Sequence, residues 1–523
     1  MNMYLGMGLV WASLMSCVSA PKAALDSPTS SQEQQNVHVL PGQPHAELWF
    51  KGTVEQAFEK ARQDNSLVFL YWGAVWCPPC NELKANVFSK PQFVELMRGF
   101  VPVYLDGDTE EAQTWGERLQ TSGYPTVLIL DRERKELFRL GSSINIEEFA
   151  EAIQPLVGAS HNFASALDAL KKGSLTGADW KILAFADWDQ LPSQYGDAAA
   201  RRTLLQKAAM TVPSSLKQEK ALLTAAYLSA WAGAKGDLSA AERDEAKALL
   251  EPLLQDKKAV ETARSFVVNQ AASVLGKLYP DPKVPAYQKT KKLWLEAAEH
   301  IEADPKASVD TRLSALRPAF ECFRLEQPEG KIPDSLKKQV QTAVALADER
   351  AQSEYERHAV ISGAAYFLRQ VGDGEGARRL LEAELARTNT PWYYQSSLAS
   401  LELEAGHPKK AQEWSAKARA SAQGRATKIQ WITNDILLNA KHLDKDQSVY
   451  LQSLAKEYYQ IATSLNDGFS GRNKTRSQRV LEALMPLKAD PEFKKVLTTY
   501  APLCQKQSGE SRAACEAHFQ QYR

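Results

Sequence analysis

The stretch Leu-Val-Phe-Leu-Tyr-Trp-Gly-Ala-Val-Trp-Cys-Pro-Pro-Cys, residues 67–80, decides the fold of this chain. Its first six residues are an apolar run of strand formers, which predicts a buried strand. Cys77 and Cys80 follow where we expect a helix to begin, and the unpaired N–H groups of a helix start stabilise a thiolate. Two cysteines at this spacing can also close a small disulfide ring. The sequence therefore predicts thiol–disulfide exchange, with Cys77 as the nucleophile and Cys80 as the resolving thiol.

The same cysteine spacing has two other interpretations, half of a zinc site and a purely structural disulfide. A zinc site needs two more ligands at a suitable spacing. The chain has no second Cys-x-x-Cys pair, and its eight histidines are scattered. We therefore expect no metal and no cofactor, and redox chemistry is the favoured hypothesis.

The sequence around this stretch alternates between helical and strand-forming segments. Apolar residues at helical spacing predict helices, and runs of β-formers predict strands. The predicted helices cover residues 55–63, a segment from residue 80, a short segment after Pro91, 110–119 and 146–156; the predicted strands cover 67–72, 101–105, 126–130 and 137–140. This order indicates an α/β domain around one sheet, which we place at residues 46–157.

Residues 163–523 show helical periodicity and no convincing strand. An internal repeat stands out, with an offset of 34 residues: Ala365, Gly372, Ala377 and Leu380 recur as Ala399, Gly406, Ala411 and Trp414. Small residues at a helix crossing, a glycine turn, then an alanine and a bulky residue are typical of tetratricopeptide-like repeats. We predict an all-α helical-repeat domain, an α-solenoid with degenerate repeats. The alternative is an irregular helical bundle that contains one chance pair.

A second motif, Gly123-Tyr124-Pro125-Thr126, lies directly before the predicted strand that ends at residue 130. Together with Trp-Cys-Pro-Pro-Cys after an apolar strand, this motif resembles the thioredoxin family. The resemblance implies a thioredoxin fold in which Pro125 has a cis peptide bond and faces the cysteines. It also implies that Trp76, Tyr124 and Pro125 contact the substrate. Within the family, the domain is most similar to exported domains of the reductase type.

Several residues near the cysteines are expected to tune their redox chemistry. Tyr71 stands where thioredoxins usually carry a buried Asp that relays protons for the inner thiol, and Tyr104 aligns with the Lys often paired with that Asp. A phenol with an ordinary pKa of about 10 is a poor proton acceptor at neutral pH. Pro78 and Pro79 stiffen the turn and remove two N–H donors that could otherwise stabilise a Cys77 thiolate.

The N-terminal residues predict export. Residues 1–20 contain an apolar run that is short for a membrane span and is followed by polar sequence, as in a signal peptide. Two cleavage sites compete: a lipobox ending at Cys17 would leave that cysteine lipidated, and residues 18–20 have the small-residue pattern of ordinary cleavage. A buried helix is the remaining alternative. Residues 21–45 predict a flexible linker. The expected location is the periplasm or cell envelope of a bacterium, with a Cys17 lipid as the one expected membrane attachment.

The three other cysteines lie in the helical region. Cys504 and Cys515 flank a predicted turn between two short helices, and in an exported chain we expect them to form a structural disulfide. The alternative is a second redox pair that relays electrons from Cys80. Cys322 lies between apolar residues of a helical pattern and is expected to be a buried free thiol.

Lys plus Arg and Asp plus Glu number 63 each, so the formal charge is zero. This balance gives no electrostatic reason to expect nucleic acid or an anionic membrane as a partner. The sequence predicts an exported thiol–disulfide oxidoreductase, of the reductase or isomerase direction, with an upstream electron donor or acceptor. Its partners would be exported proteins with cysteines, held by the helical domain. The alternative is a scaffold or assembly protein whose helical domain binds partners and whose thioredoxin-like domain is a docking or redox-gated module.

Overall fold

The computed structural model describes residues 44–121, 123–141, 144–156, 161–236, 238–440 and 445–523. These residues form two compact units. The first unit contains His161–Asp304 and Ala315–Gly330, and the second joins the described part of Val39–Ser160 to Pro305–Ser314 and Lys331–Arg523. The predicted signal peptide with Cys17, and all but the last two residues of the predicted linker 21–45, lie outside the described residues.

One mixed sheet of four strands, in the order β2-β1-β3-β4, lies in the second unit. The strands are β1 (Leu67–Gly73), β2 (Phe100–Asp106), β3 (Thr126–Leu130) and β4 (Glu136–Leu140). β1 is parallel to β2 and antiparallel to β3, and β4 is antiparallel to β3. Because central β1 is buried on both faces, its sequence is a continuous apolar run and does not alternate.

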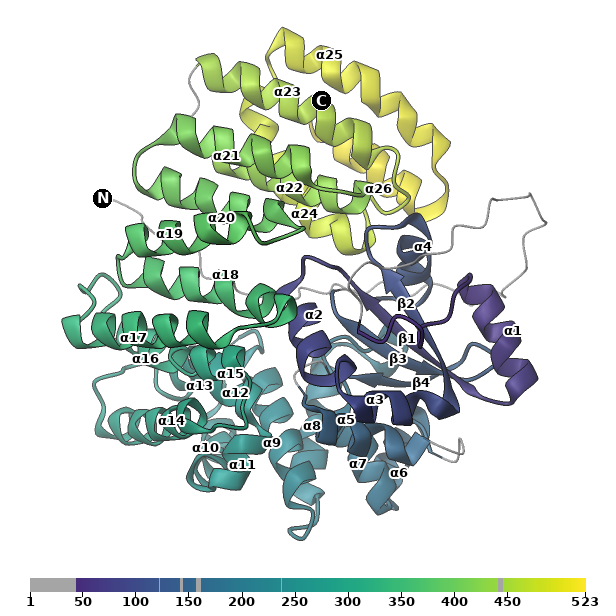
Figure 1. Ribbon diagram of the computed structural model, residues 1–523, viewed down its shortest axis with the longest axis vertical. Helices are drawn as coiled ribbons and strands as arrows, with labels where there is room; N and C mark the ends of the chain where they lie inside the picture. The colour runs from purple at the N-terminus through teal and green to yellow at the C-terminus, as the bar shows by residue number, and fades with distance from the viewer. Residues whose placement is uncertain (1–43, 122, 142–143, 157–160, 237, 441–444) are drawn as a thin grey trace. The chain divides into compact units, whose positions relative to one another are not determined.

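Helices cover both faces of this sheet (Figure 1). They are α1 (Val54–Asp64), α2 (Pro78–Leu83), the π-helical turn η1 (Lys84–Phe88), α3 (Pro91–Leu96), η2 (Met97–Gly99), α4 (Glu110–Arg118), α5 (Ile146–Ile153) and η3 (Gln154–Leu156). On one face, Phe58 of α1 and Trp115 of α4 pack with Leu70 of β1. On the other face, the ring of Phe69 contacts aromatic rings of η1, α3 and α5. This arrangement is the thioredoxin fold that the sequence predicted.

Each strand and helix predicted within residues 46–157 is present, with small differences at the ends. Side-chain caps explain several helix starts: Thr53, Thr109 and Asn145 each accept a backbone N–H from the first turn of the helix that follows. The π-helical turn at Lys84–Phe88 was not predicted. Hydrophobic periodicity does not distinguish one π turn from a continuing α-helix.

After Leu156 the described residues contain helices and no strand. The helices of the first unit are α6 (Phe163–Lys172), α7 (Gly177–Phe185), η4 (Ser193–Tyr195), α8 (Ala198–Thr211), α9 (Lys217–Ala232), α10 (Ala240–Gln255), α11 (Lys257–Thr262), α12 (Arg264–Asn269), α13 (Ala271–Leu278), α14 (Pro285–Ala303) and α16 (Arg317–Glu326). Tryptophans anchor their packing. The buried indole of Trp294 in α14, for example, donates its N–H to the carbonyl of Val267 in α12 at 2.7 Å.

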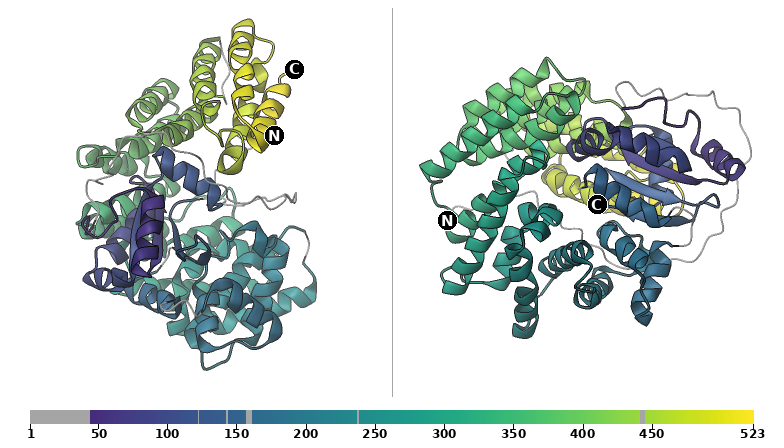
Figure 2. Two further views of the ribbon diagram at one scale, coloured as in Figure 1. Left: turned by 90° about the vertical axis from the view of Figure 1, so that its right-hand side faces the viewer. Right: turned by 60° about the horizontal axis from the view of Figure 1, so that its bottom comes forward.

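The second unit contains the remaining helices. They are α15 (Val309–Ser314), α17 (Asp334–Arg350), α18 (Glu354–Gln370), α19 (Gly374–Leu385), α20 (Pro391–Glu404), α21 (Pro408–Ser421), α22 (Arg425–Asn439), α23 (Lys445–Ala462), η5 (Gly471–Asn473), α24 (Lys474–Leu484), η6 (Met485–Leu487), α25 (Pro491–Tyr500), η7 (Ala501–Lys506) and α26 (Gly509–Gln520). From α17 to α23 each helix packs on the next, and Figures 1 and 2 show this stack in green.

The predicted repeat corresponds to two helix pairs, α18–α19 and α20–α21. Gly372 and Gly406 make the turns, with φ angles of +77° and +78° that glycine adopts at little cost. The repeated alanines are all buried where the helices cross: Ala365, Ala377, Ala399 and Ala411. The prediction of a helical-repeat region after the thioredoxin fold is therefore confirmed.

The cysteine predictions for the helical region are also confirmed. Cys504 of η7 and Cys515 of α26 form a disulfide, with their Cα atoms 5.6 Å apart. Both lie in the apolar core of the last helices. Cys322 of α16 is a buried free thiol, and burial is the main cause that raises its pKa to about 12. A thiol with such a pKa is unreactive near neutral pH.

The two units do not follow the boundary that we placed between residues 157 and 163. The helical region is divided, and α15 and α17–α26 share a unit with the sheet. The reason is tertiary packing: α18 packs on α2, and residues of α20, α21 and α22 are buried with the cysteines. Sequence composition changes at the end of the sheet domain and carries no sign of these contacts.

We predict that Gly372→Ala lowers the free energy of unfolding by about 1 kcal/mol, because an L-residue is strained at this positive φ. No atom lies within 4 Å of the added Cβ, so the cost comes from the backbone alone. Gly374→Ala, two residues on, is the control: it also has open space and its φ is not positive. It should be neutral or slightly stabilising. Urea unfolding measures both variants, and equal effects would contradict the prediction.

Candidate active site

Cys77 and Cys80 lie at the start of α2, directly after β1. Cys77 is the N-cap residue, and its sulfur accepts the backbone N–H of Cys80 at 3.4 Å. Pro78 and Pro79 occupy the first helical positions and have no N–H to offer. Both cysteines are free thiols, 5% and 0% exposed, and they hydrogen-bond to each other. This geometry suits a dithiol that closes a disulfide ring.

The two thiols differ in acidity. Burial raises the pKa of Cys77 well above its ordinary value, and the neighbouring Cys80 raises it further. Burial opposes ionisation of Cys80 as well. Its effect is outweighed by hydrogen bonds from Cys77 and from the Ala74 backbone and by the charge of Lys84, so the pKa of Cys80 is lowered. The sequence predicted the more stable thiolate at Cys77. The covered structure favours it at Cys80, because burial disfavours the charged form of Cys77, whereas hydrogen bonds and the charge of Lys84 favour the thiolate of Cys80.

Tyr71 and Tyr104 lie beside the dithiol, on neighbouring strands. They are paired across β1 and β2, and their rings stack with centroids 5.1 Å apart. Burial raises the pKa of both phenols well above the ordinary value; the charge of Cys80 is the next cause for Tyr71, and that of Asp106 for Tyr104. Both phenols therefore stay protonated at neutral pH and cannot take the proton of Cys80.

The structure brings the three predicted substrate-contact residues to Cys77. The Tyr124–Pro125 peptide bond is cis, and the Cys77 thiol donates to the carbonyl oxygen of Tyr124 at 3.8 Å. The ring of Tyr124 meets that of Trp76 edge-on, with centroids 5.9 Å apart. Trp76, Tyr124 and Pro125 thus form one surface around the sulfur, although Tyr124 and Pro125 lie far from the cysteines in sequence.

Three helices of the same unit cover this surface. Side chains from α20, α21 and α22, and from the residue that follows α21, form a buried cluster with Trp76 and both cysteines. They are Trp392, Ala418, Ala422 and Trp431. The ring of Trp76 stacks on Tyr393 at 6.2 Å and meets Trp431 edge-on at 6.3 Å. Trp76 is 8% exposed as a result. We call α20–α22 the cover.

A polar cluster joins the cover to the loop after β2. The indole N–H of Trp76 donates to Asp108 at 3.2 Å and to the hydroxyl of Thr427 at 3.1 Å, and that hydroxyl donates to Asp108. Burial, followed by the charge of Asp106, raises the pKa of Asp108 to about 8. Gly424 precedes α22, and a Cβ there would lie 2.6 Å from the Asp108 backbone oxygen. Glycine therefore permits the close approach of α22.

Arg472 of η5 adds a second polar contact beside the cover. It donates to the phenol oxygen of Tyr124 at 2.9 Å, and its guanidinium lies over the ring of Trp72 at 5.5 Å. Asp467 accepts from the same guanidinium at 3.1 Å. Such charge-assisted contacts fix orientation as well as adding energy. The Tyr124 side chain is thus held by Arg472 from a segment far along the chain.

Sequence reasoning missed Asp108, Thr427, Trp431 and Arg472 as parts of this site. Thr427 is 351 positions from Trp76, and no motif spacing connects residues so distant. Tryptophan at helical apolar spacing, as in α22, predicts packing but does not say against which surface. The glycine before α22 was the one local sign of a close approach, and its partner could not be read from the sequence.

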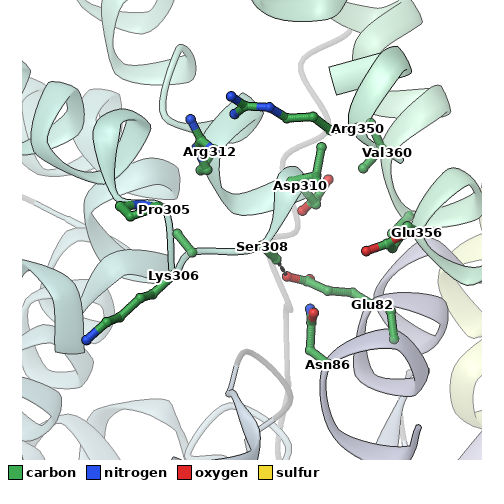
Figure 3. A pocket seen from close by; sticks show the side chains of 14 residues that line it. Glu82, Asn86, Pro305, Lys306, Ser308, Asp310, Arg312, Arg350, Glu356 and Val360 are labelled. Carbon is green, nitrogen blue, oxygen red and sulfur yellow. Dashed lines mark hydrogen bonds between the residues drawn. The ribbon is translucent and has the colours of Figure 1, made fainter. Parts of the chain in front are cut away.

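A cavity of about 330 Å³ lies near α2 but does not include the sulfurs. Figure 3 shows Glu82 and Asn86 on one side and Ser308, Asp310, Arg312 and Arg350 on the other. The hydroxyl of Ser308 donates to Glu82 at 3.0 Å. Acidic and basic side chains both line the space, so it shows no preference for one charge of ligand. We assign no function to it.

Other classes of site find less support in this chain. Within the described ranges, no group of three or more His, Cys, Asp or Glu side chains is placed to hold a metal ion. In the same part of the chain, none of the helices combines the length and apolar character that a membrane crossing requires. The dithiol with its cover is therefore the candidate site of this chain.

Comparison with known proteins agrees with the fold. A thioredoxin-like family matches residues 49–132, which include both cysteines. Thioredoxin H-type of Brassica oleracea and thioredoxin H-type 1 of Brassica napus are each 32% identical to this chain over 76 residues. That stretch is 14% of this chain and 57% of each relative, so the chain spans little more than half of their length. The likeness supports thiol redox chemistry in general for the thioredoxin-like domain.

We predict that the contribution of Asp108 to the stability of the protein falls as pH rises from about 4 to about 8. Its pKa is about 8 in the folded chain against an ordinary value of 3.8, so the folded state holds a proton that the unfolded state has lost. This stabilisation is complete below the ordinary pKa and is lost as pH rises through 8. In Asp108→Asn, the midpoint of thermal unfolding should depend less on pH than in the unaltered protein. Asp64→Asn, an exposed substitution on α1, should leave this pH dependence unchanged. Parallel profiles for both variants would contradict the prediction.

Proposed function

We propose that this chain is a thiol–disulfide oxidoreductase of the reductase or isomerase direction that acts on cysteines of exported proteins. The observation that carries the proposal is the contact of the Cys77 sulfur with Cys80 on one side and the Tyr124 carbonyl before Pro125 on the other. No other described cysteine has such an arrangement, since Cys322 is a lone buried thiol and Cys504 and Cys515 are paired in a disulfide.

The proposed reaction passes two electrons from the dithiol to a client disulfide. The Cys77 thiolate attacks one client sulfur, forming a mixed disulfide while the client S–S bond breaks and its other sulfur leaves as a thiolate. Cys80, as thiolate, then attacks Cys77 and releases the first client sulfur. The ring so formed must be reduced again by an upstream dithiol donor. Trp76 and the Tyr124–Pro125 backbone would hold an extended client segment during attack.

Export is supported by two features of the chain. The apolar run within residues 1–20 has the pattern of a signal peptide, with Cys17 as a candidate lipid attachment. The disulfide of Cys504 and Cys515 favours an oxidising compartment such as the periplasm or cell envelope. We therefore propose that the clients are cysteine-containing proteins of that compartment.

The cover must move before a protein client can reach Cys77. Trp392, Tyr393 and Trp431 lie on the surface that the client would use. Two hydrogen-bond donors of the cover are buried and unpaired. They are the indole N–H groups of Trp392 and Trp431, which have no hydrogen-bond partner among the described residues. Each such group costs about 1–3 kcal/mol. This cost favours a cover that can be displaced by a client with acceptors for these donors.

The cover also favours a second candidate function. The surface that thioredoxins offer to clients is, in this chain, bound to helices of the same chain. A scaffold protein could use its thioredoxin-like domain in this way, as a docking module that fixes the helical array. Partner binding that persists when both cysteines are replaced would favour the scaffold over the enzyme.

We expect Cys77→Ser to abolish reduction of a model protein disulfide, because the attacking sulfur is absent. Cys80→Ala should instead trap mixed disulfides with clients, since the resolving step is removed. Cys322→Ala is the matched control, because this buried free thiol belongs to the first unit and is not part of the Cys77–Cys80 pair, so its removal should leave the rate unchanged. Insulin turbidity and non-reducing gels measure the two effects. A Cys77→Ser protein that remained active would end the proposal.

Loosening the cover should expose the dithiol. Trp431→Ala removes a ring that packs on Trp76. We therefore expect the cysteine pair to be alkylated faster in this variant. The rate should rise about tenfold for each ~1.4 kcal/mol that the substitution removes from the binding of the cover. Trp414→Ala, on α21 and outside the buried cluster, is the control. Mass spectrometry of iodoacetamide-treated protein measures both rates. Equal rates in the two variants would show that the cover does not limit access.

A further inference from the structure

A lysine is buried beside the dithiol. Lys84 follows Cys80 by four residues, so the two lie on the same face of α2 and its continuation. The side chain of Lys84 is 1% exposed, although lysine is seldom fully buried without a partner. The π-helical turn η1 begins at this residue, and such turns are frequent at functional sites.

The ammonium of Lys84 contacts two phenol rings. Its nitrogen is 5.7 Å from the ring centroid of Tyr104 on β2 and 5.8 Å from that of Tyr355 on α18. Cation–π contacts of this kind contribute about 0.5–2 kcal/mol, which is small beside the cost of burying a charge. No carboxylate of the described residues forms an ion pair with this nitrogen. The burial of Lys84 therefore calls for a further negative partner.

The titratable groups that surround Lys84 and the dithiol come from four segments. They are Cys77 and Cys80 at the start of α2, Tyr71 of β1, Tyr104 and Asp106 of β2, and Glu354, Tyr355 and His358 of α18. Burial is the main cause that lowers the pKa of Lys84, and the charge of Cys80 is the strongest effect opposing it. Of the surrounding groups, the thiolate of the pair is the anion that forms and disappears during exchange.

We propose that the Lys84 ammonium is the fixed positive charge that stabilises the Cys80 thiolate, in a site where a phenol at Tyr71 has replaced the expected proton-accepting carboxylate. This inference rests on the proposed thiol–disulfide exchange. Lys84 acts through space as a positioning residue and is not itself oxidised, reduced or deprotonated.

Lys84 acts in the resolving step, in which Cys80 attacks the mixed disulfide. The Cys80 thiol first loses its proton to solvent, and the thiolate is held by Lys84. It then attacks Cys77 of the mixed disulfide, the bond between Cys77 and the client breaks, and the client sulfur leaves as a thiolate that takes a proton from solvent. Two electrons have left the dithiol, and the charge of Lys84 is unchanged. Stabilising the thiolate also stabilises the reduced pair, which makes its disulfide easier to reduce.

The test compares full-length Lys84→Met with Lys84→Arg, which keeps the charge, and with Lys60→Met, which removes an exposed lysine of α1. In Lys84→Met we expect the midpoint of thiolate absorbance at 240 nm to rise by roughly one pH unit or more. The reduction potential should become more negative by ~30 mV for each tenfold loss of reduced form. Lys84→Arg should restore most of both quantities, and Lys60→Met should change neither.

The outcomes separate this inference from the function it rests on. Unchanged midpoint and potential in Lys84→Met, with activity that still depends on Cys77, would overturn the role of Lys84 and leave the proposed function intact. If the unaltered protein shows no exchange, the proposed function fails and the inference fails with it. If both Lys84→Met and Lys84→Gln fail to fold, the ammonium has a structural role and the inference is overturned.

Discussion

The indole of Trp76 is the point on which the rest of this structure depends. Its ring lies next to Cys77 in sequence and packs against Tyr393 and Trp431 of the cover. Its N–H is shared between Asp108 and Thr427. One side chain therefore connects the dithiol, the sheet domain and the helical array. Because those contacts exclude water, they also set the acidity of the groups around the sulfurs.

The electrostatics of the dithiol follow from this burial. In an open thioredoxin-like site, the helix start and solvent would together favour the thiolate of Cys77. Here burial under the cover raises the pKa of Cys77, and the neighbouring Cys80 raises it further. Cys80 retains donors and the charge of Lys84, and its pKa falls. Under the proposed function, a client that displaces the cover would readmit water to Cys77 and reverse part of this difference, so the cover would control reactivity as well as access.

Part of the helical region contacts the thioredoxin-like domain of the same chain directly. Its repeated pairs α18–α19 and α20–α21 are turned by Gly372 and Gly406, and their crossing alanines let the helices approach closely. Stacking these pairs places Trp392, Tyr393 and Trp431 along one surface, and that surface receives the thioredoxin-like domain of the same chain. Under either proposed function, a client or partner would have to compete with this internal interface.

The sequence determined the elements and the chemistry, since both depend on neighbouring residues. The apolar run of β1, the Cys-x-x-Cys spacing and the repeat that contains Gly372 and Gly406 are local patterns, and each was found where it was expected. The disulfide of Cys504 and Cys515 followed from a short turn. Only the tertiary structure decided that the dithiol is covered, that Thr427 contacts Trp76, that Arg472 contacts Tyr124, and that Lys84 is buried. These features depend on contacts between segments separated by hundreds of residues, and hydrophobic patterning states that a face is buried without stating what buries it.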